Sequence, residues 1–86
     1  MEIKLLEDVK LVYWMETIQA KVEIDGDEIQ FRYSENSKGS EFWVFDGHNW
    51  VEPSSEYEWN LQEVCSCLEI NKDSKSGELF EYIEED

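Results

Sequence analysis

The sequence predicts an α+β domain, in which a small antiparallel β-sheet of about four to five strands packs against one α-helix in the C-terminal half. Asp25-Gly26 joins two segments of alternating apolar and polar residues, which is typical of a tight hairpin. A second hairpin is predicted around Asp46-Gly47-His48-Asn49. After Pro53, a serine precedes apolar residues at helical spacing. These three features together define the fold class.

The first sixteen residues fit two patterns. Alternate positions of the second half are apolar, as in a strand: Val9, Leu11, Tyr13 and Met15. Apolar residues also occur at helical spacing, at Ile3, Leu6, Val9 and Val12. Aromatic and β-branched residues dominate the second half, so we favour one or two strands over a helix.

The Asp25-Gly26 turn sets the register of the first hairpin. Counting outward from it gives three core-facing pairs: Val22 with Ile29, Ala20 with Phe31, and Ile18 with Tyr33. The water-facing pairs are Glu23 with Glu28, Lys21 with Gln30, Gln19 with Arg32, and Thr17 with Ser34. A shift of one residue would mix the two sets, so the sequence specifies this register strongly.

The second hairpin joins residues 41–45 to residues 50–52, and Pro53 ends its second strand. Both faces of the segment 41–45 are apolar. A central strand covered on both sides, or one wrapped by the chain ends, would explain this pattern. An exposed aromatic patch would also explain it, although such patches are unusual in solitary monomers. We favour the covered strand.

A helix is predicted from the Ser54–Glu58 segment through Ile70. Ser55 can cap its first turn, and Glu58 completes a Ser-x-x-Glu capping box. The apolar residues that cluster on one face are Tyr57, Leu61, Val64, Cys65 and Leu68. Residues 71–77 form a polar loop, and residues 78–83 fit either a short strand or a helical turn.

Trp59 falls on nearly the opposite side of this helix from the core-facing residues. The same outer face carries Glu56, Glu63, Ser66 and Ile70. A tryptophan flanked by glutamates suits contact with a basic partner, because charge steers the encounter and the aromatic ring anchors it. Alternatively, the N-terminal segment or residues 79–83 cover Trp59 and Ile70.

We expect one compact domain over residues 1–83, followed by an acidic tail at residues 84–86. A chain of 86 residues leaves no room for a second domain. The longest apolar run, residues 11–15, is far shorter than the roughly 20 residues of a membrane span. Cys65 and Cys67 are too few for a disulfide scaffold, and no secretion signal is present at the N-terminus, so the sequence predicts a cytoplasmic protein.

The charge is strongly negative and unevenly distributed. The chain has 22 acidic residues against 7 Lys and Arg, a net charge of −15, yet 41% of its residues are hydrophobic, which favours a folded state. Residues 1–40 hold nine acids and five bases, whereas residues 41–86 hold thirteen acids and two bases. Such a polyanion is repelled by nucleic acids and by anionic membranes, which excludes both as direct ligands.

No residue pattern points to catalysis, to a cofactor or to a metal. The one histidine, His48, lies in a predicted turn without a Ser or Cys partner at a recognisable spacing. The segment Asn71–Gly77 resembles the start of an EF-hand loop. The match fails because Lys75 occupies a ligand position and Tyr82 stands where the bidentate Glu should be. We therefore expect a protein that is not an enzyme.

The acidic half is predicted to bind a basic protein. The candidate partner-binding residues are Glu41, Asp46, Glu52, Glu56, Glu58, Trp59, Glu63 and Glu69. Carboxylates at high density can imitate nucleic acid and block a groove lined with Lys and Arg. In size, charge and aromatic content the chain resembles the anti-CRISPR and anti-restriction inhibitors that phages and mobile elements use against host nucleases. The resemblance implies an inhibitor of a nuclease or another nucleic-acid-binding protein, without roles for individual residues.

A second interpretation needs no mimicry. An immunity-type protein or an accessory subunit that binds one basic partner would have the same composition. The sequence also leaves open a homodimer formed through an edge strand.

Overall fold

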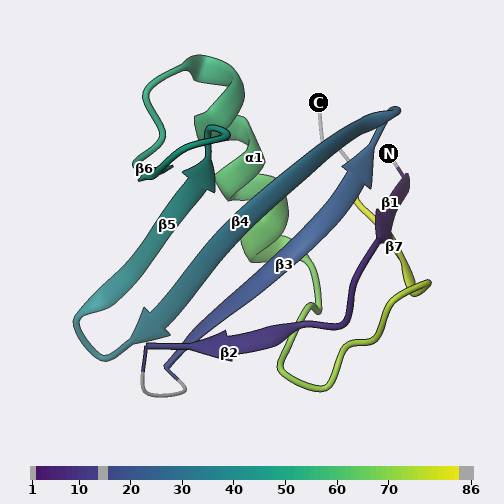
Figure 1. Cartoon of the computed structure of the whole chain (residues 1–86), viewed down its shortest axis with the longest axis horizontal. Helices are drawn as coiled ribbons and strands as arrows, with labels where there is room; N and C mark the ends of the chain where they lie inside the picture. The colour runs from purple at the N-terminus through teal and green to yellow at the C-terminus, as the bar shows by residue number, and fades with distance from the viewer. Residues whose placement is uncertain (1, 14–15, 84–86) are drawn as a thin grey trace.

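One antiparallel sheet with a single helix behind it forms the computed structural model, which describes residues 2–13 and 16–83 (Figure 1). The elements in chain order are β1 (Glu2–Leu5), β2 (Lys10–Val12), β3 (Thr17–Ile24), β4 (Asp27–Asn36), β5 (Gly39–Phe45), β6 (Trp50–Val51), α1 (Glu56–Cys67) and β7 (Leu79–Glu81). The sheet order is β6-β5-β4-β3-β1-β7, and β2 also pairs with β3. This architecture confirms the predicted α+β class. The described chain contains seven strands because the short β6 and β7 and a divided N-terminal segment join the sheet.

The hairpin of β3 and β4 has the predicted register. Val22 pairs with Ile29, Ala20 with Phe31, and Ile18 with Tyr33. The prediction that Thr17 and Ser34 face water is wrong, because both residues are buried. The turn residues Asp25 and Gly26 have φ angles of 52° and 88°. Positive φ at both central positions is the conformation that a two-residue hairpin turn requires, and glycine adopts it without steric cost.

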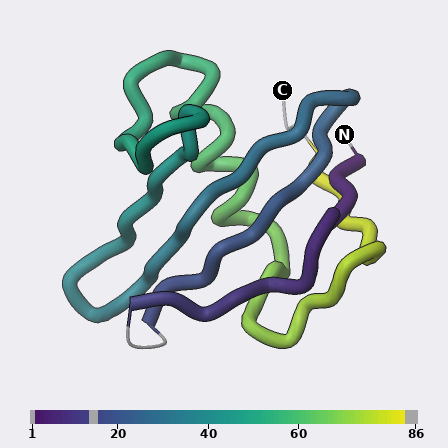
Figure 2. Tube along the Cα trace, in the orientation of Figure 1, coloured from purple at the N-terminus to yellow at the C-terminus, as the bar shows by residue number. Residues whose placement is uncertain are grey.

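The N-terminal segment is extended, which confirms strands rather than a helix. β1 pairs with the end of β3 next to the turn, and β2 pairs with the beginning of β3. Ile3 and Leu5 are completely buried. Met15, part of the predicted alternation, lies outside the described residues, as does the predicted acidic tail at residues 84–86. At the other end of the chain, β7 pairs with β1, so residues 79–81 form a strand. Figure 2 shows the yellow C-terminal segment beside the purple N-terminal segment.

β5 pairs with β4 through a turn that the sequence analysis did not identify. Ser37 and Lys38 form this turn, and Gly39 follows it with a φ of 128°. The predicted hairpin of β5 and β6 is also present, with Val44 opposite Val51 and Phe45 opposite Trp50.

The helix is shorter than predicted. The capping box of Ser55 and Glu58 is confirmed, but α1 ends at Cys67, three residues before Ile70. Ile70 then packs against the core, so its predicted place on the outer face of the helix is wrong. Tyr57 was predicted to face the core, yet it is 54% exposed. Among residues 2–13 and 16–83, no helix has the length and apolar character needed to cross a membrane.

The core lies between α1 and one face of the sheet. Leu61, Val64 and Cys65 project from the helix onto strand residues that include Phe31 and Phe42, whose rings stack with centroids 5.5 Å apart. Full burial of each large apolar side chain contributes about 1.5–3 kcal/mol. Burial also raises the pKa of the Cys65 thiol to about 12, so this thiol stays protonated at neutral pH.

Candidate partner-binding site

The outer edge of β5 is open over most of its length. β4 pairs with the inner edge from Gly39 to Val44, whereas β6 pairs only with Val44 and Phe45. Within the part of the chain that the structure describes, no strand pairs with the outer edge at residues 39–43. In Figure 1 this edge forms the left side of the sheet. Such an edge offers unpaired backbone groups to another chain.

A hollow of about 270 Å³ lies beside this edge. Three elements line it: β5, the connection from β6 to α1, and α1 itself. The lining residues are Ser40, Glu41, Phe42, Trp43, Glu52, Pro53, Trp59 and Gln62. We call this region the edge hollow. It brings together three of the predicted partner-binding residues, Glu41, Glu52 and Trp59.

The edge hollow has the chemistry of a site for a cation. Trp59 is 56% exposed, as the contact interpretation of the helix requires. Glu41 and Glu52 are also exposed, and none of the lining residues is Lys, Arg or His. A tryptophan ring attracts a cation placed over its face, and nearby carboxylates add charge-assisted hydrogen bonds.

The surrounding chain is uniformly acidic. Residues 39–71, which include β5, β6 and α1, hold seven carboxylates and neither Lys nor Arg. In contrast, Lys4, Lys10, Lys21 and Arg32 alternate with buried residues along β1 to β4, which places them on the sheet face that α1 leaves open. The tertiary structure therefore separates the charges that the sequence analysis located only by residue number.

Two of the predicted residues, Glu58 and Asp46, accept hydrogen bonds from nearby backbone N–H groups. Glu58 Oε2 accepts hydrogen bonds from the backbone N–H groups of Ser54 (2.7 Å) and Ser55 (3.4 Å). These bonds, that from Ser54 above all, lower the pKa of the Glu58 carboxyl. Asp46 Oδ1 accepts from the backbone N–H groups of Asn49 (2.7 Å) and His48 (2.8 Å), and both bonds lower the pKa of Asp46. A partner-binding role for Glu58 or Asp46 would have to coexist with these bonds.

The other predicted residues lie elsewhere. Glu56 is exposed in the first turn of α1. Glu63 lines a separate hollow of about 590 Å³ with residues of the β7 segment, and Glu69 lines a third of about 280 Å³ near the loop 71–78. The structure thus unites only part of the predicted set. Five lining residues of the edge hollow were not among the predicted site residues. Ser40, Pro53 and Gln62 carry no charge or aromatic ring that would have marked them, and the rings of Phe42 and Trp43 were assigned to a covered strand.

A cluster of aromatic residues around Arg32 covers the second face of β5. The guanidinium carbon of Arg32 lies 3.9 Å from the ring centroid of Trp50 and 5.0 Å from that of Tyr13. Arg32 also donates to Tyr13 Oη (2.7 Å) and to Gln19 Oε1 (2.9 Å). Trp43 contacts Tyr13, and Phe45 contacts Trp50. The half-buried Trp43 and Phe45 therefore contact aromatic side chains of the same chain. The favoured interpretation of β5 is nevertheless wrong in its geometry, because among the described residues β5 is neither a central strand along its whole length nor wrapped by the chain ends.

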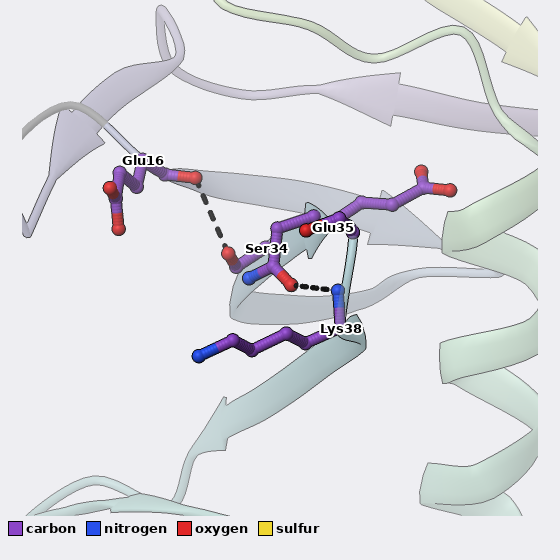
Figure 3. Close-up of a pocket in the computed structure, with 6 residues that line it drawn as sticks. Glu16, Ser34, Glu35 and Lys38 are labelled. Carbon is purple, nitrogen blue, oxygen red and sulfur yellow. Dashed lines mark hydrogen bonds between the residues drawn. The ribbon is translucent and has the colours of Figure 1, made fainter.

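A further hollow, of about 420 Å³, lies at the turn between β4 and β5 (Figure 3). Ser34 donates to the backbone oxygen of Glu16 (3.4 Å), and the Lys38 N–H donates to Asn36 Oδ1 (2.8 Å). Glu16 and Glu35 share this hollow with Lys38, and in Figure 3 the Lys38 side chain extends along it. The mixed charge makes it a poorer site for a basic ligand than the edge hollow.

No metal site is evident within residues 2–13 and 16–83, where no group of three or more His, Cys, Asp or Glu side chains could hold an ion. Comparison of the chain with protein-family models, with curated proteins and with solved structures finds no match in any of the three.

Proposed function

We propose that this protein is a small acidic inhibitor that occupies the basic nucleic-acid-binding surface of a nuclease or another nucleic-acid-binding protein. The observation that carries this proposal is the edge hollow, where the exposed Trp59 and the carboxylates of Glu41 and Glu52 face solvent without a Lys or Arg among the lining residues. The protein acts by binding, not by catalysis, and needs no cofactor.

Electrostatics favour such a partner. Duplex DNA presents one negative charge per about 1.7 Å of its axis, and proteins that bind it supply Lys and Arg to neutralise those charges. A folded chain with a net charge of −15 and an acidic segment free of Lys and Arg would be attracted to the same groove. Trp59 would add contact area and a ring for an arginine to stack on.

We place this activity in the cytoplasm. Cys65 and Cys67 are both free thiols, which suits a reducing compartment. Anti-CRISPR and anti-restriction inhibitors of phages and mobile elements work against host nucleases in such a setting, and this proposal assigns the chain to the same kind of role.

A competition experiment tests the mimicry. The tagged protein is used to capture its partner from a nuclease-treated lysate of the organism that carries the gene, and duplex DNA and single-stranded RNA are then titrated in. A mimic must be displaced by one of these nucleic acids. A stable ternary complex would contradict mimicry and would support the immunity-type or accessory-subunit interpretation.

A pair of charge-reversal variants tests the site. Glu41→Lys/Glu52→Lys should abolish capture of the partner, because it places two cations in the edge hollow. Glu2→Lys/Glu7→Lys makes the same change in net charge at exposed positions outside the hollow and should retain most of the binding. Equal losses in the two variants would show that only the overall charge matters. Glu58 is unsuitable for such a test, because its substitution would also remove the helix cap.

A further inference from the structure

The backbone of β5 presents hydrogen-bonding groups along its open edge. The Asp46 N–H donates to the Asn49 oxygen (3.0 Å) across the β5–β6 hairpin. Because successive residues of a strand direct their N–H and C=O groups to opposite edges, the groups of Phe42 and Ser40 point the same way as those of Asp46. The two-residue turn between Asn36 and Gly39 gives the same result, since it directs every second residue from Gly39 onward toward β4.

The chain's own next strand does not reach these groups. β6 consists of Trp50 and Val51 alone, and Pro53 follows one residue after Glu52. Proline has no N–H to donate and cannot extend a hydrogen-bonded ladder. The space alongside Ser40 and Phe42, where a longer β6 would have continued, is the edge hollow. One more extended segment would complete the sheet at this place.

The chemistry of the edge hollow selects a basic segment. Side chains of an added strand alternate between the two faces of the sheet. Those on the open face would lie next to Glu41, where an opposite charge is favourable across a strand pair. Those on the helix side would point toward Trp59 and Gln62 of α1. Arg32 shows the preferred arrangement within this same molecule, with its guanidinium 3.9 Å from the ring centroid of Trp50.

A second copy of the chain fits this edge less well. Pairing of two β5 edges would bring two Glu41 and two Glu52 side chains into one seam, between molecules that each carry a net charge of −15. Like charges directly opposite each other destabilise a strand pair, and charged residues on edge strands are a common protection against self-association. The same carboxylates that oppose a homodimer attract a basic strand.

We propose that the open edge of β5 binds an extended, arginine-containing segment of the partner protein by adding it to the sheet as a strand next to residues 40–43. This inference rests on the proposed function, because it specifies how the basic partner is held. Backbone hydrogen bonds from Ser40 and Phe42 supply affinity, and the carboxylates with Trp59 supply selectivity for arginine.

The test uses a peptide as the probe. An acetylated and amidated hexapeptide, in which arginine alternates with valine, is titrated into the full-length isotope-labelled protein. Backbone amide spectra and hydrogen exchange are followed at Ser40 and Phe42. Saturable binding with slower amide exchange at these two residues is expected. Two matched peptides serve as controls: one N-methylated at the valines to remove backbone donors, and one with glutamate in place of arginine. Both should lose binding.

Two double variants that replace glutamate with the uncharged glutamine complete the test. Glu41→Gln/Glu52→Gln should weaken binding of the arginine peptide about tenfold, equivalent to about 1.4 kcal/mol, whereas Glu2→Gln/Glu7→Gln should bind as the wild type does. Absence of binding, or binding of the N-methylated peptide as tight as that of the unmethylated one, would overturn strand addition. Protection of Ser40 and Phe42 that rises with protein concentration alone would identify a second copy as the occupant and also overturn it.

The outcome is separable from that of the proposed function. If the charge-reversed Glu41→Lys/Glu52→Lys variant loses the cellular partner, but the amides of Ser40 and Phe42 in the wild-type protein exchange equally fast with and without that bound partner, the inhibitor proposal stands and strand addition fails.

Discussion

Trp50 and Trp59 differ in whether a cationic side chain of the same chain covers the indole ring. Trp50 lies on the sheet face that α1 leaves open, and Arg32 of the same chain covers its ring at 3.9 Å. Trp59 projects from α1 into the edge hollow, where the lining residues include two carboxylates but no Lys, Arg or His. The first ring has its partner within the fold and contributes to stability. The second is left open, and its position suits recognition of another molecule.

The few basic residues are unevenly distributed over the fold. Four of the seven Lys and Arg lie on the open sheet face, where Lys21 pairs with Glu28 at 3.6 Å and Arg32 holds the aromatic cluster. None remains for the acidic segment 39–71. The negative charge of β5 and α1 is thus not balanced locally, and an external basic surface would lower the repulsion among these carboxylates.

The largest expected effect on stability comes from a core residue that lies beneath both the Arg32 cluster and the edge hollow. Phe31→Ala should lower the free energy of unfolding by about 3–5 kcal/mol, because Phe31 is buried in the core and stacks on Phe42. Urea denaturation followed by tryptophan fluorescence measures this loss. Gln30→Ala, at the neighbouring half-buried position, is the control. A loss as small as that of the control would show that the two surfaces do not depend on this core contact.

An intermediate effect should distinguish the two tryptophan sites. Arg32→Ala should cost about 1–2 kcal/mol of stability, because it removes two cation–π contacts and two side-chain hydrogen bonds. Trp59→Ala should cost less stability but should impair capture of the partner. Lys38→Ala, at an exposed turn position, should stay within about 0.5 kcal/mol of the wild type in the same urea titrations. If Trp59→Ala destabilised the fold more than Arg32→Ala does, the contrast between the two sites would be reversed.

The smallest effect concerns the helix that carries Trp59. The pKa of Glu58 is lowered in the folded state from its ordinary value of 4.5, so its ionised form stabilises the fold. This contribution is complete above the unfolded pKa and is lost as the pH falls through the lower folded pKa. The stability advantage of the wild type over Glu58→Ala should therefore shrink between about pH 5 and pH 3. Asn60→Ala, on the same helix but outside the capping box and without a titratable side chain, is the control; parallel pH profiles for the two variants would contradict the role of the cap.

Several features were predictable because they depend on neighbours in the sequence. The register of β3 and β4 follows from the Asp25-Gly26 turn and the strict alternation on either side, and it is confirmed pair by pair from Ile18 to Glu23. The helix start is equally local, since Ser55 and Glu58 satisfy each other's backbone groups within one turn. The end of the helix was misplaced because Leu68 to Ile70 kept the apolar pattern without a glycine stop, and packing decided that Ile70 joins the core after the chain leaves the helix.

The site was only partly predictable. Glu41, Glu52 and Trp59 were chosen for their charge or for their place on a helical wheel, and the structure brings them together in one hollow. Glu58 and Asp46 were chosen on the same grounds, yet their oxygens bind backbone N–H groups. Charge in a sequence does not show whether a carboxylate has a local donor, because that depends on the turn geometry around it.

By itself, the sequence determined the fold class, the tight β3–β4 hairpin, the capped helix and the excess of acid in the second half of the chain. These properties arise from turn chemistry, periodicity and composition, which act over a few residues or over the whole chain at once. Only the tertiary structure decided that β6 stops after two residues, that the open edge of β5 faces Trp59, and that Arg32 covers Trp50 instead. Such contacts join residues far apart in the chain, and their geometry is set by how α1 and the strands pack around a common core.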